Sequence, residues 1–245
     1  MNTLDAMNYL KKKKWIDLSH EIHESIPRFG AFNGSQEKTL FTIKKDGFFA
    51  KEYTLPTQYS THIDAPIHFA EGKRYLHEIK LKELVLPLYV IHKEDVVQNN
   101  HDYCLTVQDI LDFEAEFGPI PEGSFVAFAS GWSSRWKSTE AYYNCDKEGA
   151  AHTPGWSLAA LKYLSEIRNV TAIGHETLDT DSAADFRKNQ GLLGEYYWLK
   201  QNKYQVEVMR NLNQVPAVGS VIVTSFPNLL NAPGFPVRSI ALLPD

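Results

Sequence analysis

Two histidines, a carboxylate and an amide lie within one short stretch, Gln58-Tyr59-Ser60-Thr61-His62-Ile63-Asp64-Ala65-Pro66-Ile67-His68-Phe69. Side chains alternate between the faces of an extended strand, so Gln58, His62 and Asp64 would share one face. Residues two apart are separated by about 6.5–7 Å, which suits a cation held about 2.0–2.2 Å from an imidazole and a carboxylate. A single histidine in a half-buried strand is more often a polar residue with its own hydrogen-bond partner. Two histidines with an aspartate are less easily accidental, and the spacing leaves both interpretations open.

Pro66 limits the length of this strand, because proline has no N–H to donate inside a sheet. We therefore expect the strand to end near Ala65 and the chain to turn there. His68 can then return over the site without being a ligand.

The same residues resemble a family signature. Thr61-His62-x-Asp64-x-Pro66-x-His68-Phe69 is similar to the pattern His-x-Gly-Thr-His-x-Asp-x-Pro-x-His-Phe of the cyclase family of metal-dependent hydrolases, which includes bacterial kynurenine formamidase and isatin hydrolase. This chain departs from the pattern at two places, where Gln58 replaces the first histidine and Ser60 replaces glycine. The resemblance implies that His62 and Asp64 bind the metal and that His68 transfers protons. Because a neutral amide oxygen binds a metal less strongly than imidazole does, we expect Gln58 to be a weak or outer-sphere ligand.

Further ligands must come from elsewhere in the chain, since a metal site needs more than two protein ligands. The segment 206–216 resembles the family's Glu-Asn-Leu…Leu-Asp-Gln-Leu-Pro stretch, which implies that Glu207 is the carboxylate ligand of a second site. Two-metal members have a histidine twelve residues earlier, where this chain has Glu195. With Gln58, two histidine ligands are thus replaced, which leaves open one ion or two. Such a donor set suits Mn²⁺ or Mg²⁺ as well as Zn²⁺.

Three other residues are candidates for the same site. His175 follows a predicted buried strand at 170–174, and strand ends of this kind often carry active-site residues. It supplies a missing nitrogen ligand or lines the pocket, and the sequence does not choose between them. Phe29, in the loop 25–30, and Trp132, at the start of an aromatic segment 132–151 interpreted as a long loop, are candidates for substrate binding. For Phe29, simple packing within the loop is an equally good interpretation.

The remaining pattern predicts an α/β fold. Apolar runs predict strands at 15–19, 40–43, 48–55, 84–92, 124–129, 170–174, 204–209, 220–226 and 237–243. Helical spacing and caps predict helices at 1–13, 106–117, 157–167 and 191–203. The order strand, helix, strand over 124–174 favours a parallel pair. We expect one domain over residues 1–245 with a mixed β-sheet or barrel-like core and flanking helices, and the resemblance implies the swivelling β/β/α type.

The composition is ordinary for a globular protein, with 43% hydrophobic and 22% charged residues among 245. A net charge of −5 gives no reason to expect nucleic acid or an anionic membrane as partner. No apolar run is long enough to span a membrane, and residues 1–14 lack the apolar core of a signal peptide. Cys104 and Cys145 show no metal-binding spacing. We expect a reduced cytoplasmic chain and, from the resemblance, a homo-oligomer, dimer or tetramer, with a small-molecule substrate.

The sequence therefore predicts a metal-dependent hydrolase. The resemblance implies cleavage of a small amide, formamide, lactam or lactone, on an aromatic or ring substrate, by metal-activated water. The ordinary pKa of histidine, about 6.5, suits His68 to move protons near neutral pH. One alternative is a lyase or isomerase, such as a ring-closing enzyme, on the same metal. The other is a non-catalytic metal-binding or ligand-binding member of the family, which the replacements at Gln58 and Glu195 motivate.

Overall fold

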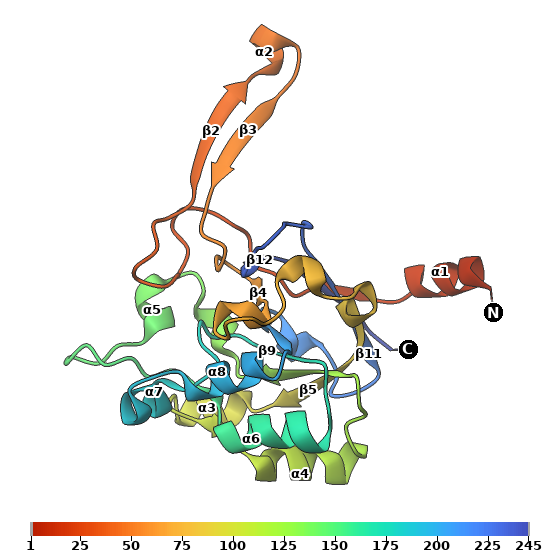
Figure 1. The fold of residues 1–245 in the computed structure, drawn as a ribbon, viewed down its shortest axis with the longest axis vertical. Helices are drawn as coiled ribbons and strands as arrows, with labels where there is room; N and C mark the ends of the chain where they lie inside the picture. Colours follow the sequence, from red (N-terminus) through yellow and green to blue (C-terminus); the bar gives the residue numbers. More distant parts are fainter. Residues whose placement is uncertain (1, 245) are drawn as a thin grey trace.

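A nine-stranded mixed sheet, curled into a half-barrel, forms the centre of the molecule (Figure 1). A computed structural model describes residues 2–244. The strand order is β1-β13-β11-β5-β7-β9-β10-β4-β12; β5, β7, β9 and β10 are parallel, and the strands outside them pair antiparallel. Their bounds are β1 Trp15–Asp17, β4 His62–Asp64, β5 Val85–His92, β7 Phe125–Ala129, β9 Ala172–His175, β10 Tyr204–Glu207, β11 Ser220–Ser225, β12 Gly234–Pro236 and β13 Arg238–Leu242. The predicted mixed α/β fold with flanking helices is confirmed.

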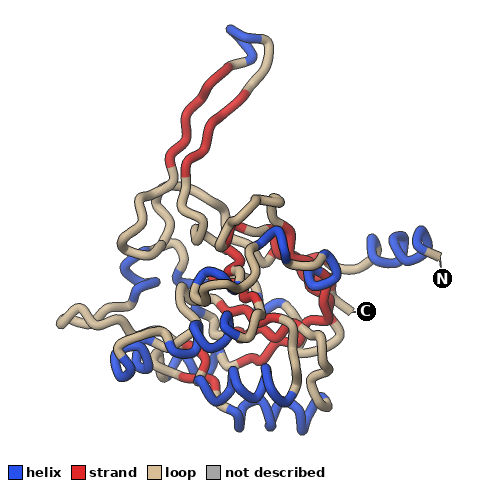
Figure 2. Tube along the Cα trace, in the orientation of Figure 1, coloured by secondary structure: helices blue, strands red, loops and turns tan. Residues whose placement is uncertain are grey.

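The central strands are buried on both faces, as parallel strands usually are. Along β7, Phe125 and Ala127 pack into one hydrophobic cluster, while Val126 and Phe128 pack into a second cluster beneath the helices. Helices gather below the sheet in Figures 1 and 2, and their bounds are α3 Glu94–Asn99, α4 Val107–Phe117, α6 Leu158–Lys162, α7 Ala183–Asn189 and α8 Leu193–Lys200. The strand ends that carry polar residues are therefore held by a rigid core.

Local capping signals place two of these helices where the sequence predicts them. Helix α4 begins with a capping box in which the Thr106 backbone N–H donates to Asp109 over 2.7 Å, and it ends before Gly118. Ser157 caps α6 by accepting from the Ala160 N–H. The chain continues from α6 as a π-helical turn over Tyr163–Ile167. The apolar spacing of the predicted helix 157–167 would place Ile167 on its buried face, but in this wider turn the side chain of Ile167 is 60% exposed.

A long hairpin arm projects from the body (Figures 1 and 2). It consists of β2 Gln36–Phe41, the short helix α2 Ile43–Asp46 and β3 Ala50–Thr54, and its two strands pair with each other in a separate sheet. The sequence predicted strands at 40–43 and 48–55 here. The first strand lies earlier, at Gln36–Phe41, and the chain turns through the short helix α2, which Gly47 ends with a φ of 81°.

The N-terminal helix and the segment 132–151 each differ in one respect from what the sequence predicts. Helix α1 Thr3–Lys11 forms as predicted but buries none of its residues. The segment predicted as a long loop at 132–151 contains a 3₁₀ turn, Trp132–Arg135, and helix α5 Thr139–Tyr143. After it, β8 Gly155–Trp156 pairs with β6 Cys104–Leu105. Across residues 2–244, no helix is long and apolar enough to cross a membrane.

Candidate functional site

Strand β4 carries the predicted metal ligands and lies between two antiparallel neighbours. Glu207 of β10 is directly opposite His62, and Gly234 of β12 is opposite Asp64. The strand ends at Asp64, and Pro66–His68 forms a 3₁₀ turn, as the proline predicts. Gly234 is required for this close approach, since a Cβ there would lie 2.6 Å from the Ile63 carbonyl oxygen and 3.2 Å from Asp64 Oδ1.

Two groups of ligand atoms meet around Asp64. His62 Nε2 lies 3.4 Å from Glu207 Oε2 and 3.6 Å from Asp64 Oδ1, and these three residues could hold one ion. A second group joins Asp64 with His68 and Glu195. His68 Nε2 is 3.9 Å from Asp64 Oδ1, and its side chain is 26% exposed, whereas the four other residues are buried. Asp64 is thus common to both groups.

One hydrogen bond fixes the orientation of the His62 ring. Its Nδ1 lies 2.9 Å from the Ser60 carbonyl oxygen, and because a carbonyl only accepts, Nδ1 must carry the proton. Nε2 then faces the two carboxylates, as in metal sites where a backbone carbonyl orients the ligand. Ser60 has a φ of 58°, the left-handed conformation that glycine adopts most easily. The serine at this motif position therefore keeps the backbone turn that aims its carbonyl at His62.

Gln205 is the central residue that sequence reasoning missed. Its amide Nε2 lies 2.9 Å from Glu207, 3.1 Å from Asp64 and 3.2 Å from Glu195, and the side chain is fully buried. Its amide oxygen accepts from the Thr180 hydroxyl over 2.7 Å. A neutral donor thus holds three carboxylates together. The period-two alternation of β10 places residue 205 on the same face as Glu207, and that signal could have found it.

Gln58 also reaches the cluster, but through its nitrogen. Its Nε2 donates to Asp64 Oδ1 over 3.2 Å, while its Oε1 contacts the Thr57 hydroxyl. Because an amide nitrogen is a donor and not a metal ligand, Gln58 in this orientation supports Asp64 from outside the ligand set.

The site contains buried polar atoms without hydrogen-bond partners. Among residues 2–244, Glu195 Oε2 and His175 Nδ1 have no hydrogen-bond partner. His175 Nε2 lies 3.2 Å from Glu207 Oε1. Asp181 accepts from the backbone N–H groups of Gly194 and Glu195, which places Glu195 at the start of α8. Since unpaired buried polar groups are costly, the donor set fits a divalent metal ion.

The excess of negative charge in the site also fits a divalent metal ion. Burial raises the pKa of Glu195 well above its ordinary value, and the charge of Glu207 adds to this. Burial, with Glu207, Asp181 and Asp64, raises the pKa of Asp179 to about 7. Burial would lower the pKa of His62, but Asp64 and Glu207 outweigh it and raise that pKa to about 9. A divalent cation among these carboxylates would offset their mutual repulsion and favour their charged forms.

A mostly apolar cavity of about 450 Å³ opens above these residues. Phe29 and Trp132 both line it, as do Phe32, Phe69, Tyr142, Tyr143, Leu178, Phe186 and Leu192. The described lining residues include no lysine or arginine. Glu176 secures the Trp132 wall, because it accepts from the backbone N–H groups of Ser130 and Trp132 over 2.9 and 3.0 Å.

The fold and site define a metal-dependent hydrolase. Residues 16–182 match the model of the Cyclase family, and the protein belongs to that family. It is 27% identical to the isatin hydrolase of Roseibium aggregatum over 202 residues, 80% of this chain and 76% of the relative. It is 35% identical to the kynurenine formamidase of Geobacillus thermodenitrificans over 80 residues, 32% of this chain and 38% of the relative. The structure of isatin hydrolase A from Labrenzia aggregata bound to benzyl benzoate superposes with a TM-score of 0.90, at 26% identity and 99% coverage of both chains.

Proposed function

We propose that this enzyme hydrolyses a neutral aromatic lactam or aryl formamide with a divalent cation held by His62, Asp64 and Glu207. The observation that carries this proposal is the placement of that ligand group at the floor of an aromatic cavity. The described lining residues include no lysine or arginine to pair with an acidic substrate, so an uncharged ring is the better match. The relatives named above are an isatin hydrolase and a kynurenine formamidase, which makes cyclic amides and aryl formamides the first substrates to test.

The donor set favours manganese. One imidazole with two carboxylates is rich in hard oxygen ligands, which suit Mn²⁺ better than a site with several imidazoles would. When bound, the cation supplies a water of lowered pKa and polarises a carbonyl. Zinc is the comparison metal, because imidazole and carboxylate also bind Zn²⁺.

His68 moves the proton in this proposal. It lines the cavity, and its Nε2 lies at the edge of the ligand group, 3.9 Å from Asp64. From there it takes a proton from the attacking water and delivers it to the leaving nitrogen, as general acid–base residues do. The second ligand group, Asp64 with His68 and Glu195, favours a competing role in which His68 binds a second ion.

One experiment tests the reaction class. The purified protein is analysed for metal and then assayed with isatin and an aryl formamide in ¹⁸O-labelled water. We expect the carboxylate product, which is the ring-opened acid from isatin or the formate released from the aryl formamide, to carry the label. An unlabelled product would support a lyase or isomerase, and a bound metal with no turnover on any amide or ester would support a non-catalytic binding protein. His92→Ala is the control, because this histidine pairs with Glu94 outside the cavity.

We also propose that the enzyme is a homo-oligomer in which the hairpin arm packs against a second copy. Six large apolar side chains of the arm are between 42% and 72% exposed, namely Leu40, Phe41, Ile43, Phe48, Phe49 and Tyr53. A free two-stranded hairpin is marginally stable in water. Six such side chains offer roughly 600 Å², near the ~800 Å² that each partner buries in a standard interface.

The occupant that fits the arm is another copy of this chain. The arm points away from its own body (Figure 1), so it does not cover the apolar rim of its own cavity. At that rim, Phe29 and Phe186 are 59% and 48% exposed. Each copy thus carries an apolar arm and an exposed apolar surface, and two copies together can cover both.

A further inference from the structure

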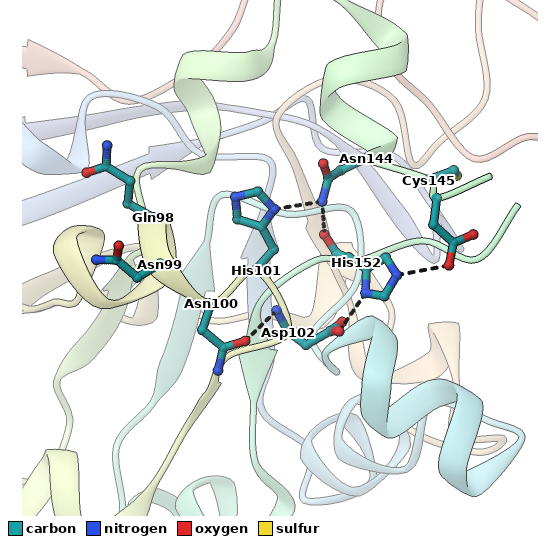
Figure 3. A pocket seen from close by; sticks show the side chains of 9 residues that line it. Gln98, Asn99, Asn100, His101, Asp102, Asn144, Cys145 and His152 are labelled. Atoms are coloured by element: carbon teal, nitrogen blue, oxygen red, sulfur yellow. Dashed lines mark hydrogen bonds and ion pairs between the residues drawn. The ribbon is translucent and has the colours of Figure 1, made fainter. Parts of the chain in front are cut away.

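A small hairpin over residues 144–152 forms one wall of the cavity. Cys145 and Ala151 pair as an antiparallel bridge, and Asp146 accepts from the backbone N–H groups of Glu148 and Ala150 to close the turn. Ala151 lines the cavity on one side. On the other side the hairpin borders a polar groove of about 410 Å³, shown in Figure 3. Contacts in this groove therefore hold a wall of the proposed active site.

His152 lies in the groove between two carboxylates (Figure 3). Its Nδ1 is 2.6 Å from Asp102 Oδ2, and its Nε2 is 3.2 Å from Asp146 Oδ2. A carboxylate only accepts hydrogen bonds, so both ring nitrogens must carry protons to satisfy both contacts. The two aspartates accordingly raise the pKa of His152 above its ordinary value of 6.5.

Asp102 connects this histidine to a second wall of the cavity. Arg187 of α7 lies 3.4 Å from Asp102 and donates to the Ala151 carbonyl oxygen. The same helix supplies Ala183 and Phe186 to the cavity. Asp102 thus lies between an imidazolium and a guanidinium, and it ties the hairpin to α7.

The remaining polar groups of the groove hold the base of the hairpin. Asn144 donates to the His152 carbonyl oxygen over 2.7 Å and accepts from Arg135 over 3.2 Å. His101 lies 2.8 Å from Arg135 and 3.0 Å from Asn144. The charged groups around His152 are then Asp102, Asp146, Arg187 and, through Asn144, Arg135, so the local field favours its protonated form.

We propose that His152 is a positioning residue, which in its doubly protonated form clamps the 144–152 hairpin against Asp102 and so holds the cavity wall in place for substrate. A neutral imidazole has one N–H and can satisfy one carboxylate, and its free lone pair would then face the other. The clamp therefore loosens as pH rises through the pKa of His152. This inference rests on the proposed function only in taking the cavity as the substrate site. The contacts that close the hairpin do not depend on it.

Limited proteolysis tests the clamp without any substrate. Lys147 is exposed in the turn of the hairpin, and Lys12, exposed after α1, is an internal reference within the same digest. Between about pH 6 and about pH 9, tryptic cleavage at Lys147 relative to Lys12 should rise about threefold in the wild type, as expected for loss of a partly exposed ion pair. In His152→Gln the ratio should be high at both pH values. A wild-type ratio that is flat, or a variant that matches the wild type, overturns the proposal.

Asp146→Asn provides the second variant. Its Oδ1 can still accept from the backbone of the turn, while its amide nitrogen takes the place of the oxygen that faces His152. An amide N–H can donate to a neutral imidazole, so this hairpin should stay closed at about pH 9 and lose its pH response. A pH response like that of the wild type would contradict the proposal, even if His152→Gln folds poorly.

Kinetics with isatin provide the functional readout. His152→Gln should raise KM about threefold with kcat nearly unchanged, because the wall binds substrate but does not touch the reacting atoms. His92→Gln is the matched control, since its side chain is also 33% exposed and also pairs with a carboxylate, but away from the cavity. A fall in kcat at constant KM would contradict a positioning role. If the wild type does not turn over isatin, that substrate assignment fails, while the proteolysis result still decides the clamp.

Discussion

Contacts within the protein hold the proposed metal ligands His62 and Asp64 in place. The Ser60 carbonyl orients the histidine, and the amides of Gln58 and Gln205 donate to the aspartate. Such supporting contacts set both the direction and the basicity of metal ligands. The ligand atoms of these two residues are therefore the part of the site most sensitive to substitution.

We predict that His62→Ala and Asp64→Ala each lose the metal. Each substitution removes one of the three proposed ligands, His62, Asp64 and Glu207. No other described histidine or carboxylate on β4 can replace it. Elemental analysis of the purified variants gives the measurement, with His92→Ala as a control that should keep its metal. Full occupancy in either variant would show that the ion binds elsewhere.

We predict that His68→Gln keeps the metal and the melting temperature of the wild type but lowers kcat by about 10²–10⁴-fold. His68 is partly exposed at the cavity and pairs weakly with Asp64 at 3.9 Å, so its loss leaves the core intact. Metal stoichiometry, melting temperature and turnover are measured on one variant. A parallel loss of metal and activity would instead make His68 a ligand of a second ion.

Part of this site could be predicted from the sequence because it is local. His62 and Asp64 share a face through the two-residue period of a strand, and Pro66 ends that strand. Gln205 could not be placed beside Asp64 in the same way. Its proximity depends on the pairing of β10 with β4, whose paired residues Gln205 and Asp64 lie 141 positions apart in the sequence, and pairing of distant strands leaves no local trace. The sequence could therefore predict which residues share a face of one strand, but not which residue of another strand lies beside them.

At the scale of elements, helix α4 depends on the charge at its first turn. Lys93 lies 2.8 Å from Asp109, and the Thr106 hydroxyl donates to the same carboxylate over 2.6 Å. Burial would raise the pKa of Asp109, but Lys93 and Thr106 outweigh it and lower that pKa from 3.8 to about 2. Because the folded-state pKa is the lower one, this stabilisation is present above pH 3.8 and is lost as the pH falls through about 2.

We predict that Asp109→Asn lowers the free energy of unfolding by about 2 kcal/mol at neutral pH, at about 1.4 kcal/mol per pKa unit. The difference from the wild type should shrink toward zero near the folded pKa of about 2. Urea unfolding at several pH values gives the measurement. Asp112→Asn, on the exposed side of the same helix, should change stability little. An equal loss at all pH values would show that the cap acts through packing and not through charge.

Helices with capping residues at their ends lie where the sequence predicts them. Segments whose conformation depends on contacts with distant parts of the chain differ from the prediction. Thr106 and Gly118 bound α4 through caps that can be seen in the sequence. The π-helical turn that exposes Ile167 has no such signal. It depends on how the chain meets its next element, which hydrophobic periodicity does not report.

At the scale of the whole molecule, a substitution in the hairpin arm tests the proposed assembly most directly. We predict that Phe49→Glu shifts the enzyme to smaller assemblies, because it places a charge among the exposed apolar side chains of the arm. Analytical ultracentrifugation at micromolar concentration gives the measurement. Leu81→Glu is the matched control, since Leu81 is 83% exposed on the body. A wild type that sediments as a monomer with its arm intact would refute the proposed assembly.

The position of β4 between β10 and β12 also has a consequence for synthesis. His62 and Asp64 are translated well before Glu207 and the pairing strand Gly234–Pro236. Because pairings so distant in sequence form late, the proposed ligand set is incomplete until both partner strands of β4 have been made. Binding of the cation by these residues would therefore follow the pairing of β4 with β10 and would not precede it.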